Sequence, residues 1–182
     1  MRYQKISIDG LNVIKHYESL HDGNLKKIGL QPKMCPSGFW TIGYGHLVTD
    51  INGKPYEGKE SYERMIKDHP EVETITELKA VELLDIDCDF REGIINRMNL
   101  NLSQCQFDSQ VSLLYNIGAG QYSNSTVLRL LKTMNPTIYY TKAIEDAILA
   151  WKKSKGQVLP GLVARRKTEA YLFKTGEVKF FN

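Results

Sequence analysis

Glycine and aromatic residues are interleaved in the run Cys35–His46, which reads CPSGFWTIGYGH. The apolar side chains can fix a short strand in a core. The glycines allow tight turns and a close approach of the backbone to a ligand. The run therefore predicts a rigid strand and turn that present three polar groups, those of Cys35, Thr41 and His46.

Glu18 precedes this run on a stretch with helical periodicity. The apolar residues of that stretch recur at near-helical spacing, at Leu11, Ile14, Tyr17 and Leu20, and Asp9 is a plausible N-cap. A carboxyl group on a helix that faces a polar group on a β-turn across a cleft is what hydrolysis of a glycosidic bond requires.

The two halves of the chain differ in character. Residues 23–58 are rich in Gly, Pro, Asn and Asp, which favours short strands and turns. From Thr76 onward the pattern is helical, and Ser103 with Gln106 forms a capping box that opens one helix, which Gly118 and Gly120 stop. The other predicted helices are about 78–98, Ser125–Met134, Tyr139–Trp151 and Pro160–Phe173, the last with Pro in its first turn.

The sequence resembles the phage-type lysozymes of glycoside hydrolase family 24, the endolysin muramidases, in their cysteine-containing branch. The likeness rests on Glu18, Cys35 and the run TIGYGH at 41–46. Further family-like stretches follow in order, namely 75–77 (ITE), 106–108 (QFD), 116–120 (NIGAG), 125–126 (ST), 159–163 (LPGLV) and 165–166 (RR). The fold implied is an α+β lysozyme-like single domain over residues 1–182, with a mainly helical body, a small β-rich lobe at about 23–75 and a cleft between them.

By this resemblance Glu18 is the catalytic acid, and desolvation at the cleft edge would favour its protonated form. Cys35 takes the place often held by Asp. A thiol is a poorer base than a carboxylate, so Cys35 either holds or activates the attacking water as a thiolate or attacks the sugar directly. Thr41 positions the water, and five residues separate it from Cys35, as in the family. We expect His46 to fix the loop through a hydrogen bond.

One departure concerns the second catalytic group. Sixteen residues lie between Glu18 and Cys35, more than is usual in the family. The extra segment, about residues 23–32, must bulge out if Cys35 is to face Glu18. Lys27 stands at the usual spacing and cannot replace an acid, and Asp22 is the nearest alternative carboxylate.

Substrate-binding candidates are Leu47, Tyr115 and Asn116. Tyr115 could pack on a sugar face or belong to the core, and Asn116 could bond an N-acetyl or hydroxyl group. Arg165 and Arg166 either lie near Glu18 and tune its acidity or are solvated. The cluster Lys152, Lys153 and Lys155 is expected on a solvated face of the late helices.

Composition excludes several other classes of function. The net charge of +3 is too small to argue for nucleic acid, and no apolar run approaches the ~20 residues that span a bilayer. Three widely spaced cysteines form no disulfide framework, and Cys88 and Cys105 are expected in the core. The four histidines form no metal-ligand motif, so no metal is expected, and the resemblance implies no cofactor.

The sequence thus predicts a muramidase that cuts the β-1,4 bond between N-acetylmuramic acid and N-acetylglucosamine in bacterial peptidoglycan. The expected role is lysis of a bacteriophage host. We expect a monomer that stays in the host cytoplasm until it is released to the wall, because no signal peptide is apparent. Two alternatives remain, an inactive wall-binding protein with the same fold and a lytic transglycosylase, which would leave 1,6-anhydro ends.

Overall fold

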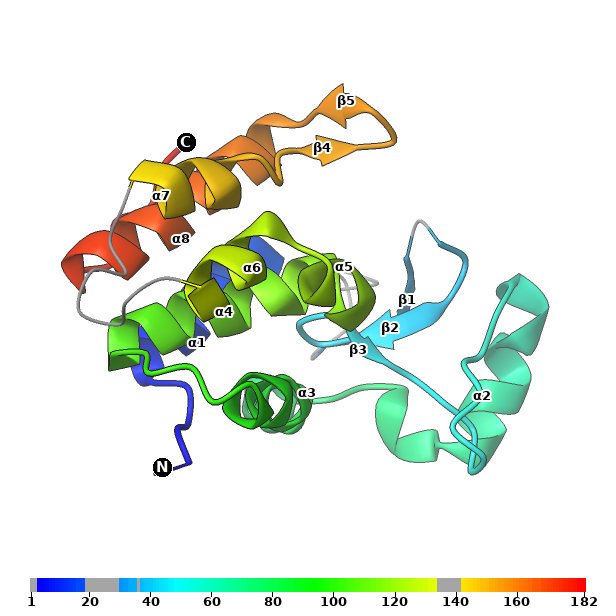
Figure 1. The fold of residues 1–182 in the computed structure, drawn as a ribbon. Coiled ribbons are helices and arrows are strands. Elements are labelled where there is room, and N and C mark those ends of the chain that lie inside the picture. Colours follow the sequence, from blue (N-terminus) through cyan, green and yellow to red (C-terminus); the bar gives the residue numbers. More distant parts are fainter. Residues whose placement is uncertain (1–2, 19–29, 36, 134–141) are drawn as a thin grey trace. The chain divides into compact units, whose positions relative to one another are not determined.

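The computed structural model describes residues 3–18, 30–35, 37–133 and 142–182. The chain divides into two compact units, Met1–Tyr17 with Cys88–Asn182, and Glu18–Asp87. We call them the helical unit and the sheet unit. Figure 1 shows helices and short antiparallel strands, as the predicted α+β class requires.

The sheet unit is built on three short antiparallel strands, β1 (Lys33–Met34), β2 (Trp40–Ile42) and β3 (His46–Leu47). The turn between β1 and β2 is closed by two backbone hydrogen bonds. Gly38 donates to the Cys35 carbonyl at 2.9 Å and Cys35 donates to the Phe39 carbonyl at 2.8 Å. The strand and turn expected within residues 35–46 are therefore confirmed.

Short helices follow the sheet, η1 (Lys59–Ser61), α2 (Tyr62–Asp68) and η2 (Pro70–Val72). The Trp40 indole donates to the Gly58 carbonyl at 2.9 Å, and its ring packs on Tyr62. The buried apolar residues described in this unit include Ile42, Tyr44, Val48, Tyr56, Met65, Ala80 and Leu84. Most of the predicted bulge at 23–32, with Asp22 and Lys27, lies outside the described residues.

Gly43 fixes the sheet against α3 (Glu77–Arg97), the predicted long helix. Its φ of +62° is a left-handed conformation that suits glycine. A Cβ at this position would lie 3.0 Å from the Cβ of Ala80 and 3.3 Å from its Cα. The glycine therefore allows both the turn and the close approach of the strand to the helix.

The helical unit packs around two long helices, α4 (Gln104–Ile117) and α8 (Pro160–Thr175). Helix α7 (Lys142–Leu149) packs against α8 and against α6 (Thr126–Thr133), and α5 (Ala119–Ser123) joins α4 to α6 (Figure 1). The apolar side chains of these helices form the core, among them Phe107, Val111, Leu114, Leu131, Ile148, Leu172 and Phe173.

The helix ends test the predicted caps. Ser103 accepts from the Gln106 N–H and Gln106 accepts from the Ser103 N–H, so the capping box is confirmed. Asp9 as N-cap is wrong. Helix α1 (Ile8–Glu18) begins one residue earlier, and the Ser7 hydroxyl accepts from the Gly10 N–H at 3.4 Å. Gly118 ends α4 as predicted, but Gly120 lies inside α5.

The bounds of the later helices agree with the predicted bounds only in part. Helix α6 starts one residue after the expected Ser125, whereas Met134 and the expected start at Tyr139 lie outside the described residues. Helix α7 ends at Leu149, two residues before Trp151, because the chain turns there into a two-stranded hairpin. Helix α8 begins at Pro160 as predicted.

The two cysteines expected in the core differ in their burial. Cys88 is fully buried on α3, whereas Cys105 is only half-buried in the first turn of α4. All three cysteines are free thiols.

Asp108 on α4 is a buried carboxylate that holds the N-terminal segment. It accepts hydrogen bonds from the Ser7 backbone N–H at 2.9 Å, from the Ser7 hydroxyl and from the Gln104 amide at 2.8 Å. Burial raises the pKa of Asp108, and these hydrogen bonds oppose the rise.

Candidate active site

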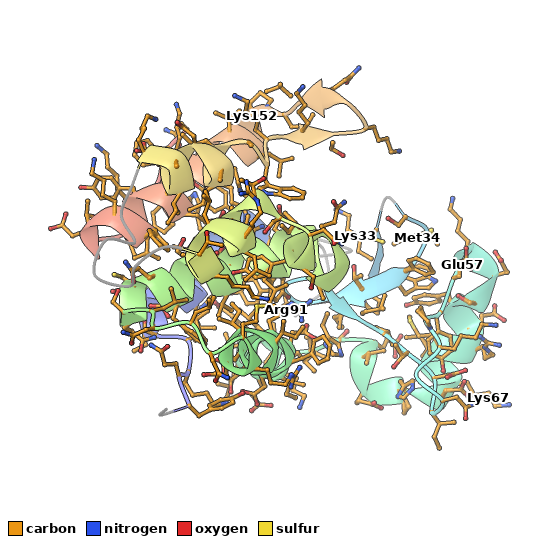
Figure 2. The ribbon with its side chains drawn as sticks, viewed as in Figure 1. Lys33, Met34, Glu57, Lys67, Arg91 and Lys152 are labelled. Carbon is orange, nitrogen blue, oxygen red and sulfur yellow. The ribbon has the colours of Figure 1, made fainter. Side chains whose placement is uncertain are left out.

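Thr41 lies in the central strand of the sheet, directly opposite Lys33 on β1 and Leu47 on β3. Side chains of directly opposed residues lie on the same face of a sheet. The Thr41 hydroxyl is buried and donates to the Lys33 carbonyl at 3.1 Å, which fixes its rotamer. The structure thus brings together two predicted site residues, Thr41 and Leu47, and adds Lys33, which was not among the predicted site residues. Figure 2 labels Lys33.

Cys35 follows β1 at the start of the tight turn. It stands two residues after Lys33, which pairs with Thr41. The thiol is free and half-buried, and the two hydrogen bonds of the turn fix its backbone. It is thus a free thiol on a fixed backbone, next to the strand that pairs with the strand of Thr41.

Glu18 is the last residue of α1, and it is half-buried. The helix presents it from a regular backbone, as the periodicity predicted. Convergence of Glu18 with Cys35 and Thr41 on one reacting bond remains a prediction.

His46 forms the hydrogen bond that was expected of it. Its Nδ1 lies 3.1 Å from an Oδ2 of Asp87, and both side chains are partly exposed. Asp87 belongs to α3, so this contact ties the end of the glycine-rich run to that helix. No local spacing relates Asp87 to residue 46, so the sequence did not predict this partner.

Arg165 and Arg166 are buried, so their reading as solvated residues is wrong. Their partner is Glu169, one turn later on α8, whose side chain is also fully buried. The Arg165 Nε lies 3.2 Å from Glu169 Oε1, and the Ser112 hydroxyl donates to the same oxygen at 2.7 Å. The i,i+4 and i,i+3 spacing to Glu169 is the sequence signal that could have revealed this cluster.

Tyr115 and Asn116 stand at the end of α4 and are linked to arginines of the same unit. The guanidinium carbon of Arg91 lies 4.1 Å from the centroid of the half-buried Tyr115 ring and covers one ring face (Figure 2 labels Arg91). The Asn116 Oδ1 accepts from Arg166 Nη2 at 3.1 Å. The buried Arg166–Glu169 pair therefore supports an exposed amide that can still donate two N–H groups.

No group of three or more His, Cys, Asp or Glu side chains is placed to hold a metal ion in the part of the chain that the structure describes. None of the helices described is both long enough and apolar enough to cross a bilayer.

The helices, the small antiparallel sheet and this polar sheet face define a lysozyme-like α+β protein. A family model described as phage lysozyme matches residues 26–169, so the chain belongs to the phage lysozyme family. The resemblance seen in the sequence motifs is thereby confirmed.

Individual relatives agree with this assignment. The chain is 31% identical to an endolysin of Acyrthosiphon pisum secondary endosymbiont phage 1, over 93% of this chain and 98% of the relative. It is 35% identical to an endolysin of Bacillus phage B103, over 96% of this chain but only 56% of that protein. The chain thus spans little more than half the length of this Bacillus phage relative.

A solved structure gives the same fold. The muramidase domain of SpmX from Asticaccaulis excentricus superposes with a TM-score of 0.69 at 30% identity, covering 94% of this chain and 99% of that domain. The predicted lysozyme-like fold class is confirmed.

Proposed function

We propose that this chain is an endolysin-type lysozyme that hydrolyses the β-1,4 bond between N-acetylmuramic acid and N-acetylglucosamine in bacterial peptidoglycan. The observation that carries the proposal is the phage lysozyme match over residues 26–169, which includes Cys35, Thr41, Leu47, Tyr115 and Asn116. The titles of its relatives, endolysin and muramidase domain, describe the same class of activity.

In the proposed reaction Glu18 donates a proton to the leaving glycosidic oxygen. The Thr41 hydroxyl already donates to the Lys33 carbonyl, so its oxygen lone pairs are left to accept a hydrogen bond from the attacking water. Cys35, in the turn that follows β1, holds or activates that water, or attacks the sugar directly. No cofactor takes part.

Three residues are proposed to bind the substrate. Leu47 offers an exposed apolar side chain beside Thr41. Asn116 donates its amide N–H groups to an N-acetyl carbonyl or a hydroxyl, and Tyr115 offers the ring face opposite Arg91 to a sugar. The single-domain organisation over residues 1–182, the monomeric state and retention in the host cytoplasm until release to the wall belong to the same proposal.

Turbidity clearing of peptidoglycan suspensions tests this function. Glu18→Gln removes the proton donor and is expected to lower the clearing rate by a factor of at least about 100. Glu63→Gln, which neutralises an exposed carboxylate on α2, is the matched control and should clear at the parental rate. Equal rates for the two variants would contradict the proposed role of Glu18.

Cys35 and Thr41 are tested in the same assay. Cys35→Asp supplies a carboxylate that can serve as base, whereas Cys35→Ser offers only a hydroxyl. We therefore expect Cys35→Asp to clear faster than Cys35→Ser. Thr41→Val keeps the branched shape but removes the hydroxyl, and it should slow clearing without unfolding the protein.

A further inference from the structure

The chain carries an exposed basic hairpin between α7 and α8. Strands β4 (Lys153–Ser154) and β5 (Gln157–Val158) pair antiparallel, with Lys153 opposite Val158 and Ser154 opposite Gln157. Residues 152–159 are all exposed, and the hairpin extends away from α7 and α8 (Figure 1). The three lysines are exposed, as expected, but they lie on a hairpin and not on a helix face, because α7 ends at Leu149.

The positive charge of this hairpin is not balanced locally. Lys152, Lys153 and Lys155 fall within four positions, and the sequence has no acidic residue between Asp146 and Glu169. Glu169 is buried against Arg165 and Arg166. Within the described ranges no carboxylate lies at ion-pair distance from any of the three lysines. Figure 2 labels Lys152 at the base of the hairpin.

The turn of the hairpin holds a lysine in an unfavourable conformation. Lys155 has φ +48° and Gly156 has φ +81°, as in the two central residues of a type I′ turn. Glycine, asparagine and aspartate adopt this conformation readily, whereas a lysine does so only at a cost. A charged residue therefore stands at the tip although a glycine would form the turn more easily.

Apolar side chains accompany the charges. Val158 is exposed directly opposite Lys153. Leu159 is also exposed, and its backbone N–H donates to the Lys152 carbonyl at 3.1 Å, so the ladder extends to this pair. Lys153 and Lys152 thus each have an exposed aliphatic neighbour on the other strand, Val158 and Leu159.

We propose that the β4–β5 hairpin is a docking surface for the carboxylate-bearing peptides of peptidoglycan. The proposal rests on the proposed function, which makes peptidoglycan the polymer that the enzyme must hold. The three ammonium groups match the carboxylates of the wall peptides, and the aliphatic residues match their short alkyl side chains. The hairpin would hold the wall without touching the scissile bond.

Co-sedimentation with purified sacculi tests this surface. The variant K152Q/K153Q/K155Q is compared with K54Q/K59Q/K67Q, which removes three exposed lysines of the sheet unit and gives the same net charge. At low salt we expect the hairpin variant to bind about tenfold more weakly than the parent, and the control variant to bind as the parent does. The difference should shrink at high salt, because exposed charge pairs are screened.

Substrates that differ in their peptides and phosphate-bearing polymers show which of these the hairpin binds. One arm uses sacculi stripped of phosphate-bearing polymers but retaining their peptides, and the other uses glycan strands freed of peptides by an amidase. The proposal expects the tenfold difference on the first and none on the second. A difference that disappears once the phosphate polymers are removed, or equal binding by parent and hairpin variant on intact sacculi, would overturn it.

A failure of the proposed function would look different. In that case the parent would release no reducing ends from either substrate. The comparison of parent and hairpin variant in the binding assay would still show whether the hairpin binds the wall peptides. If both proposals hold, the hairpin variant cuts peptide-free glycan at the parental rate, because the residues around Thr41 are unchanged.

Discussion

Arg166 Nε lies 2.9 Å from Glu169 Oε2, and neither side chain has exposed surface. The pair joins α8 to α4, because Arg166 also donates to Asn116 and Glu169 accepts from the Ser112 hydroxyl. A buried carboxylate with two arginines and a hydroxyl around it is costly to leave half-paired.

Glu169→Gln should therefore destabilise the fold. It removes the buried negative charge that Arg165 and Arg166 share, for which we expect a loss of about 3 kcal/mol in the free energy of unfolding. Urea denaturation measures the change. Glu177→Gln, at an exposed position just after α8, should be nearly neutral, and a similarly small effect at residue 169 would show that the pair does not support the fold.

Gly43→Ala separates conformational strain from steric strain. Alanine at φ +62° is strained, and its Cβ would also press on Ala80 at 3.0 Å. Gly53 has φ +77°, and an added Cβ there would meet no atom within 4 Å. We expect a loss of about 1 kcal/mol for Gly53→Ala and at least about 2 kcal/mol for Gly43→Ala by urea denaturation. Equal losses would mean that the contact with α3 is not tight.

Asp108→Asn should change the pH dependence of stability. Burial raises the folded pKa of Asp108 above its unfolded value of about 4, so the folded state holds the proton more tightly. This contribution to stability is present at low pH and is lost as the pH rises from about 4 through the folded pKa. The parent should therefore lose stability relative to Asp108→Asn over that window, as measured by urea midpoints. A difference that stays constant with pH would contradict the raised pKa.

Lys155→Gly should make the hairpin more stable while weakening the docking proposed for it. Relief of the left-handed lysine is worth about 1 kcal/mol, which should slow hydrogen exchange of the Leu159 N–H about fivefold. Lys153→Gly, in a strand, should speed the same exchange. Unchanged or faster exchange in Lys155→Gly would argue that the turn is not strained.

The structural features predicted correctly from the sequence are those that depend on residues close together in the chain. The capping box at Ser103 and the strand around Thr41 depend on residues a few positions apart, and the structure confirms both. The basic hairpin was not predicted because its turn residues are Lys155 and Gly156. The usual sequence signals for such a turn are Asn-Gly and Gly-Gly. Burial of Arg165 and Arg166 was missed because it depends on Ser112 and Asn116 of a distant helix. Glu18 with Cys35 stays a prediction, because periodicity does not bring distant residues together.

Mass spectrometry of the fragments released from peptidoglycan in ¹⁸O-labelled water decides whether this enzyme hydrolyses the bond with Glu18 as the acid. We expect fragments that end in reducing N-acetylmuramic acid with one labelled oxygen, and their absence with Glu18→Gln. Fragments with 1,6-anhydro ends and no label, or reducing ends formed equally by Glu18→Gln, would contradict this expectation.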